Sequence, residues 1–168
     1  MFQRLKDWYF ESQLAAHRDK TARAIAKHGW TATYVGDERS DQAEFAYTIG
    51  FSDFGAPELI VFDLDPVLMN YVFWEAFERV KSGSELFDGF VFREPDPEAN
   101  GFECTFRTAR HSEVWDRYVF DAIAYSRFRG RGDRPDVMQI VWPSSRTLLY
   151  PWDLDCPPEV TRAQPKLY

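Results

Sequence analysis

The pattern of hydrophobic and polar positions divides the first part of the chain into one helix and three strands. Apolar residues recur at helical spacing over residues 2–28, and Gly29 follows as a stop signal, which predicts an amphipathic helix. Bulky and polar residues alternate over 30–35 and again over 45–51, which predicts two strands joined by the charged loop GDERSDQ. The nearly continuous apolar run ELIVF after Pro57 is typical of a central strand buried on both faces.

The second part of the chain alternates helices and strands in the same way. Asp65 followed by Pro66 marks a helix start, because the carboxylate accepts free amide protons while proline has none to donate, and this helix runs to about Lys81. The later predicted elements are strands at 87–93 and 102–107, a helix capped by Ser112 and ending near Gly130, and strands at 137–142 and 147–152. The proline-rich tail from Cys156 is expected to be an extended strap over the surface.

This order of elements predicts an α+β fold. A mostly antiparallel or mixed sheet is flanked by about three helices, and it either stays open or curls toward a barrel. We expect residues 1–28 to form an N-terminal helical extension and residues 29–168 to form a single α+β domain.

Composition narrows the classes of protein that fit. The 168 residues are 45% hydrophobic and 17% aromatic, enough for a core without disulfides or metals. A net charge of -7 disfavours contact with nucleic-acid phosphates or anionic lipid, and no apolar run has the length of a membrane span or the form of a signal peptide. Two cysteines make no disulfide framework, so a cytoplasmic location is expected.

Metal and thiol chemistry have little support in the sequence. The three histidines lack the spacing of metal ligands, so no metal site is predicted. Cys104 alternates with Phe102 and Phe106 on an apolar face. This favours a buried structural cysteine over a nucleophile paired with His111.

Polar residues in the predicted central strands are the candidates for a site. Thr48 and Gly50 share a small strand face with Ala46, which could accept a ligand or a closely packed helix. Glu58 precedes one buried strand and Gln139 interrupts another, and a buried carboxylate or amide must be hydrogen-bonded. They either bond each other and the backbone or line a pocket, and the structural network is favoured.

Several of these segments resemble one bacterial family. FAYTIGF, PELIVFDL, the helix with Asn70, QIVWP, YPW and Gln164-Pro165 look like the domain-of-unknown-function family 4262, over about Gly29 to Leu167. The resemblance implies a small α+β domain and carries no chemistry, because no catalytic residues are established for that family.

A second resemblance concerns cofactor binding. A strand ending in TIGF, then PELIVFDLD and a helix, is similar to flavin-reductase-like split barrels around their flavin phosphate, and implies FMN near Thr48 and Ser52. The chain lacks the run of serines and threonines those proteins use there.

Two functional hypotheses follow. The first is a non-catalytic module that binds an unidentified protein or small molecule, with Tyr47, Trp142 and Trp152 as aromatic anchors. The second is a flavin-binding, split-barrel-like oxidoreductase. The exposed aromatic residues could also form a homodimer interface. No nucleic acid or membrane partner is expected. The candidate ligand- or partner-binding residues are Tyr47, Thr48, Gly50, Ser52, Glu58, Asn70, Gln139, Trp142, Trp152 and Gln164.

Overall fold

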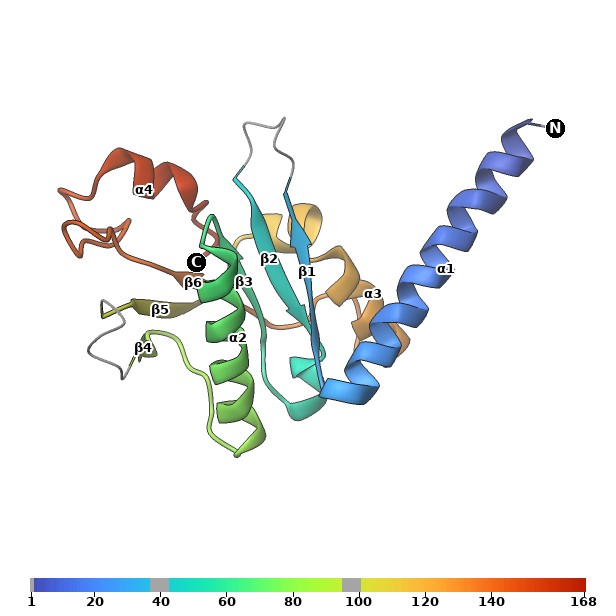
Figure 1. The fold of residues 1–168 in the computed structure, drawn as a ribbon, viewed down its shortest axis with the longest axis horizontal. Helices are drawn as coiled ribbons and strands as arrows, with labels where there is room; N and C mark the ends of the chain where they lie inside the picture. Colours follow the sequence, from blue (N-terminus) through green and yellow to red (C-terminus); the bar gives the residue numbers. More distant parts are fainter. Residues whose placement is uncertain (1, 37–42, 95–100) are drawn as a thin grey trace.

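A six-stranded mixed sheet organises the part of the chain that the structure describes (Figure 1). The computed structural model describes residues 2–36, 43–94 and 101–168, with the backbone alone for residues 2–12 and 14. The strands are β1 (Thr31–Val35), β2 (Phe45–Ile49), β3 (Glu58–Phe62), β4 (Val91–Arg93), β5 (Glu103–Thr108) and β6 (Val137–Val141).

The sheet consists of two antiparallel three-stranded units joined by one parallel pair. The strand order is β1-β2-β3-β6-β5-β4, in which β3 and β6 run parallel and every other neighbouring pair is antiparallel. The sheet is open, with β1 and β4 at its edges. The α+β prediction with a mixed sheet is confirmed, and the barrel alternative is wrong.

Helices cover both faces of the sheet. The helical elements are α1 (Phe2–His28), η1 (Phe51–Phe54), α2 (Pro66–Lys81), η2 (Val114–Tyr118), α3 (Phe120–Phe128) and α4 (Pro158–Ala163). On one face, α2 packs Val72, Phe73 and Phe77 into a cluster with strand residues such as Leu59 and Phe106 (Figure 1). On the other face, η2 and α3 pack on the alternate strand residues.

The predicted start of α2 is confirmed. The Asp65 carboxylate accepts hydrogen bonds from Val67 N at 2.9 Å and Leu68 N at 3.3 Å, and Pro66 occupies the first helical position. This signal can be recognised in the sequence because the cap and its partners are only two and three residues apart.

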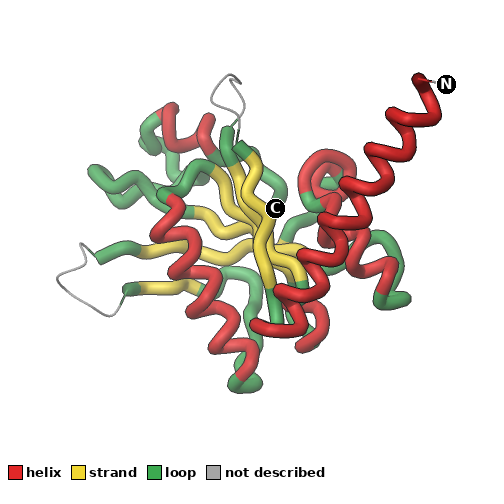
Figure 2. Tube along the Cα trace, turned by 45° about the vertical axis from the view of Figure 1, so that its right-hand side comes forward, coloured by secondary structure: helices red, strands yellow, loops and turns green. Residues whose placement is uncertain are grey.

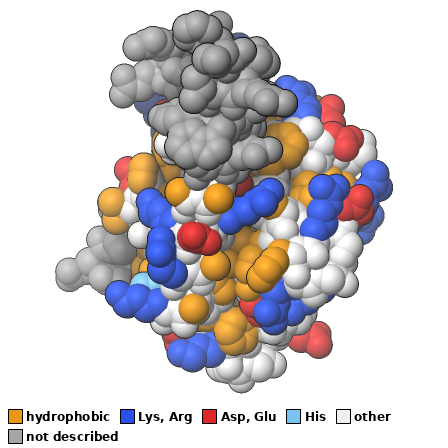
Figure 3. Space-filling view, turned by 90° about the vertical axis from the view of Figure 1, so that its right-hand side faces the viewer, with side chains coloured by type: hydrophobic (Ala, Val, Ile, Leu, Met, Phe, Trp, Pro, Cys, Tyr) orange, Lys and Arg blue, Asp and Glu red, His pale blue; other side chains and the backbone are white. Residues whose placement is uncertain are grey.

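Among its described side chains, helix α1 contacts the rest of the fold through His17, whose Nε2 lies 3.1 Å from Asp121 Oδ2, and through Ile25 near its end. It forms over the predicted residues, but among its described side chains Ile25 alone is buried, and residues 15–20 are exposed. Figure 2 shows the rest of the helix projecting away from the sheet. Figure 3 views the side that carries α1, where small hydrophobic patches lie between Lys and Arg side chains. The amphipathic prediction for residues 2–12 concerns side chains outside those that the structure describes, and over residues 15–28 only Ile25 is buried.

Four other predictions need correction. Residues 147–152 form turns and no strand, because the backbone of the loop bonds to itself, as in the hydrogen bond from Ser144 N to Leu149 O at 2.8 Å. The strand predicted at 87–93 is regular only from Val91. The helix predicted from Ser112 is broken at Val119, which has φ -89° and ψ 44°. The tail is not wholly extended, because it contains α4.

Candidate functional site

The end of the FAYTIGF segment (residues 45–51) wraps around a buried carboxylate. Glu58, at the start of β3, is 1% exposed. Its carboxylate accepts hydrogen bonds from the Thr48 hydroxyl at 2.8 Å, Gly50 N at 2.9 Å, Ser52 N at 3.2 Å and Phe51 N at 3.3 Å. Thr48 Oγ1 in turn accepts a hydrogen bond from Leu59 N at 2.8 Å. Glu58 therefore fixes the turn from β2 into η1.

The hydrogen bonds around Glu58 have a structural role. Burial raises the pKa of Glu58, while the Thr48 hydroxyl and the amides of Ser52 and Gly50 oppose that rise by stabilising the charged form. All four donors point at the protein's own carboxylate. They are therefore not available to an FMN phosphate, and the proposed placement of FMN at Thr48 and Ser52 does not fit this geometry.

Gly50 is required by the same turn. Its φ is +112°, a region that L side chains rarely adopt, and a Cβ there would lie 2.9 Å from Gly29 O. The small strand face predicted around Gly50 therefore accepts the link between α1 and β1, and no ligand is needed to explain it.

The two buried glutamines anchor the end of the chain. Gln139 on β6 donates from Nε2 to Pro165 O at 2.8 Å and accepts from Leu167 N at 3.0 Å. Gln164 accepts from Trp142 N at 3.0 Å and donates to Trp142 O at 2.9 Å, so its amide continues the β6 backbone pairing. Glu58 and Gln139 do not bond each other, and each is satisfied by backbone groups and, for Glu58, by Thr48.

The other sequence candidates lie in separate places. Tyr47 is 2% exposed, and its hydroxyl donates to Asp121 Oδ2 at 3.2 Å. Trp142 is half-buried and donates from Nε1 to Phe62 O at 2.8 Å. Asn70 is exposed on α2. Trp152 is 42% exposed in the loop after β6.

Trp152 belongs to an aromatic group at the end of the sheet. Its ring stacks on Tyr150 with centroids 4.6 Å apart and an interplanar angle of 4°, and it meets Tyr168 edge-on at 5.8 Å. The guanidinium of Arg107, on β5, lies 5.3 Å from the Trp152 centroid and 4.8 Å from the Tyr168 centroid. Sequence reasoning identified Trp152 but not its neighbours, because they come from three distant segments.

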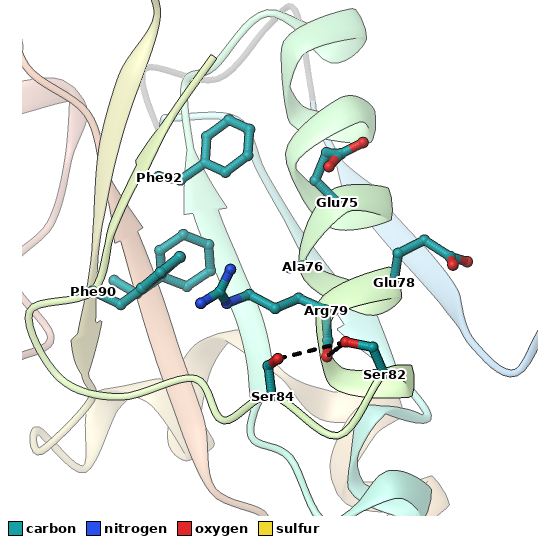
Figure 4. Close-up of a pocket in the computed structure, with 9 residues that line it drawn as sticks. Glu75, Ala76, Glu78, Arg79, Ser82, Ser84, Phe90 and Phe92 are labelled. Atoms are coloured by element: carbon teal, nitrogen blue, oxygen red, sulfur yellow. Dashed lines mark hydrogen bonds between the residues drawn. The ribbon is translucent and has the colours of Figure 1, made fainter. Parts of the chain in front are cut away.

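A second region, absent from the sequence candidates, is a pocket between α2 and the β4–β5 edge (Figure 4). Its volume is about 300 Å³. The lining residues are Glu75, Ala76, Glu78, Arg79, Ser82, Ser84, Phe90, Phe92 and Phe106. The alternation of Phe90 and Phe92 was the one local signal in the sequence, and nothing there paired those rings with Arg79.

The thiol prediction can be compared with the structure directly. Cys104 is fully buried, and burial raises the pKa of its thiol, so the thiolate is disfavoured. The interpretation of Cys104 as a structural cysteine is consistent with this environment.

Within the described ranges, none of the helices is both long and apolar enough to cross a membrane.

Comparison with known proteins gives one match. No curated protein and no solved structure matches the chain. A family model described as "Domain of unknown function (DUF4262)" matches residues 24–157, which includes all six strands together with α2 and α3. The resemblance expected from the sequence is confirmed. The chain therefore belongs to the DUF4262 family.

Proposed function

We propose that this protein is a non-catalytic module that binds a partner protein through its aromatic loop surface. This surface consists of the exposed side chains Leu148, Trp152 and Leu154 together with Tyr168 and Arg107. The observation that carries the proposal is the exposure of large apolar side chains in one short loop: Leu154 is 98% exposed, Leu148 70% and Trp152 42%.

The composition of this surface is that of an interaction hot spot. Tryptophan, tyrosine and arginine are enriched among residues that dominate binding energy at protein interfaces. Here Trp152, Tyr168 and Arg107 lie within ring-contact distance of one another. Each of them offers a large contact area with a polar or charged end.

The aromatic residues are held in place before any partner arrives. The Tyr150 hydroxyl donates to Glu103 Oε1 at 2.8 Å, and Tyr150 N donates to Asp153 Oδ2 at 2.7 Å. Because Trp152 stacks on this fixed ring, binding costs less side-chain entropy than it would for a freely rotating tryptophan. Leu148 has φ +59°, an unfavourable backbone conformation for a leucine, of the kind that often occurs at functional loops.

The charges on this surface indicate what the partner presents. Lys166 Nζ lies 5.6 Å from the Tyr168 centroid, and Arg107 lies beside the same ring. Because Arg107 already pairs with Asp88 at 3.1 Å, a matching partner surface has an apolar hollow for Leu154 and Trp152 with a carboxylate at its rim opposite Lys166. The non-catalytic part of the proposal is supported by Glu58 and Cys104, since both are buried inside the fold.

Site-specific photo-crosslinking tests this proposal. A photoreactive phenylalanine analogue replaces Leu154 in the full chain, expressed in the cells that naturally make it, and Val67, which is 77% exposed on α2, is the matched control position. We expect a discrete adduct with another protein from position 154, none from position 67, and loss of the adduct when Trp152→Ala is added.

Three results would contradict the proposal. They are equal labelling from both positions, no adduct at position 154, or an adduct that persists in the Trp152→Ala background. An adduct with a second copy of the chain would replace the partner protein by self-association through the same surface.

A further inference from the structure

We propose that the pocket between α2 and the β4–β5 edge binds a small carboxylic acid with a flat apolar body. This site is separate from the aromatic loop surface, and its occupancy does not depend on the partner protein. The inference rests on an arginine that faces phenylalanine rings without a carboxylate of its own (Figure 4).

Phenylalanine rings form the apolar part of the pocket. Phe106 is fully buried, and its ring meets that of Phe90 at 5.5 Å with an angle of 65°. Phe92 is half-buried and is supported by Tyr71, whose ring centroid is 5.9 Å away. Rings held at steep angles to one another leave faces and edges on which a flat ligand packs well.

Arg79 supplies the charge. Its guanidinium carbon lies 4.5 Å from the Phe90 centroid, and Figure 4 shows the side chain reaching from α2 toward that ring. Within the described part of the chain, the guanidinium makes no ion pair, whereas Arg93, Arg107 and Arg131 each have one. A guanidinium placed over a ring keeps in-plane N–H donors for a carboxylate, which it can hold with two parallel hydrogen bonds.

The negative groups around Arg79 limit the ligand to one negative charge. Glu75 and Glu78 also line the pocket, and their carboxylates point away from the rings in Figure 4. The pocket also lies at the last turn of α2, where free carbonyl groups carry partial negative charge. A phosphate dianion would be repelled by these groups, while a monocarboxylate held at Arg79 is tolerated.

Two serine hydroxyls lie beside Arg79, and Ser84 is the one whose proton can be donated to a ligand, because Ser82 already donates its own to the backbone. Ser82 Oγ donates to Arg79 O at 2.7 Å and lies 3.5 Å from Ser84 Oγ. With about 300 Å³, the pocket has room for roughly ten water-sized groups, which matches a single aromatic ring carrying a carboxylate.

The test is an NMR titration of the full ¹⁵N-labelled chain with benzoate, compared with the neutral isostere benzamide and the cation benzylamine. We expect benzoate to shift amides of the second half of α2 and of residues 84–92, and to bind at least about tenfold more tightly than benzamide. Benzylamine is expected to bind more weakly than either, because Arg79 repels it.

Variants separate the charge from the apolar walls. Arg79→Gln is expected to abolish the preference for benzoate, and Arg79→Lys to keep part of it. Phe92→Leu keeps Arg79 and should weaken benzoate and benzamide by similar factors. Arg146→Gln is the matched control, since Arg146 is an exposed arginine outside the pocket.

Several results would overturn the inference. They are equal affinities for benzoate and benzamide, unchanged benzoate binding in Arg79→Gln, tighter binding of benzylamine, shifts confined to residues elsewhere, or no shift with any probe. None of them bears on the aromatic loop surface, so this proposal and the partner-binding proposal fail independently.

Discussion

Glu58 shows how a single buried charge sets the local structure of this fold. The carboxylate stands where several backbone amides converge, and each oxygen accepts two hydrogen bonds. Oε1 serves Gly50 and Ser52, while Oε2 serves Thr48 and Phe51. Both terminal atoms of this side chain must therefore be hydrogen-bond acceptors, as the two oxygens of a carboxylate are.

The first prediction concerns the substitution Glu58→Gln. The amide nitrogen of glutamine would face two donors in either orientation, so we expect the free energy of unfolding to fall by about 2–4 kcal/mol. Urea denaturation followed by circular dichroism measures the change. Glu113→Gln is the control, because Glu113 is an exposed partner of Arg117 and its loss should cost less than about 0.5 kcal/mol. Equal stability of the two variants would show that Glu58 has no special role.

At the scale of elements, side-chain amides determine where the end of the chain lies. The segment from α4 to Leu167 adds no strand to the sheet, yet Leu167 is 1% exposed. Gln139 replaces the missing strand pairing by bonding the backbone on both sides of Lys166. One side chain thus supplies the hydrogen bonds that a short stretch of strand pairing would otherwise provide.

The second prediction follows from this contact. Gln139→Leu keeps the side-chain volume nearly constant but leaves Pro165 O and Leu167 N without their buried partner, which should cost about 2–4 kcal/mol. Relative to the wild-type protein, Gln139→Leu should accelerate hydrogen exchange more at residues 164–168 than in β3. Arg162→Gln, on the exposed side of α4, should change neither quantity. Unchanged exchange in Gln139→Leu would mean that the packing of Leu167 and the hydrogen bonds its carbonyl accepts from Arg110 N and His111 N hold the segment without Gln139.

The sequence predicts those elements whose signals are local. The start of α2 depends on Asp65 and Pro66, which are adjacent to the amides they affect, and the strand faces follow from simple alternation. Residues 147–152 misled the prediction because aromatic and β-branched residues also suit a loop whose rings stack on one another. The choice between an open sheet and a barrel depends on pairing between distant strands, which alternation does not encode.

The candidate sites divide in the same way. The network of Thr48, Gly50 and Glu58 could be predicted, because a buried carboxylate must find donors and the nearest backbone turn supplies them. The group of Arg107, Trp152 and Tyr168 could not be predicted, since it exists only after β5, the loop and the end of the chain meet. The role proposed for Arg79 could likewise not be predicted, because it depends on a phenylalanine ring that the fold brings opposite the guanidinium.

At the scale of the whole molecule, one buried and two half-buried tyrosines form hydrogen bonds between elements that are distant in the sequence. Tyr47 bonds Asp121 of α3, Tyr125 donates to Asp53 at 2.5 Å, and Tyr150 bonds Glu103 of β5. Burial raises the pKa of Tyr47 and of Tyr125 to about 12, and burial together with the nearby Glu103 carboxylate also raises the pKa of Tyr150. The folded state therefore holds these phenol protons more tightly than the unfolded chain does.

The third prediction is a loss of stability in alkali. The ordinary pKa of tyrosine is 10.0, so above pH 10 the unfolded chain releases protons that the folded protein retains up to about pH 12. This stabilises the unfolded state, and the urea midpoint should fall as the pH rises through this window. In the native protein, tyrosinate absorbance should show that a fraction of the tyrosines ionises at a higher pH than the rest. In urea-unfolded protein it should rise in a single step near pH 10. Superimposable titrations would refute the prediction.

The parallel pair at the centre of the sheet has a consequence for how the chain reaches its native state. Glu58 pairs with Val137, 137 - 58 = 79 positions away, whereas β1 to β3 and β4 to β6 are each built from neighbours in the chain. Closing so long a segment costs entropy before any contact compensates for it. The two antiparallel halves can form early, and we expect their union along β3 and β6 to be the slow step of folding. We therefore expect the refolding rate of this chain to depend on the pairing of β3 with β6 more than on its helices.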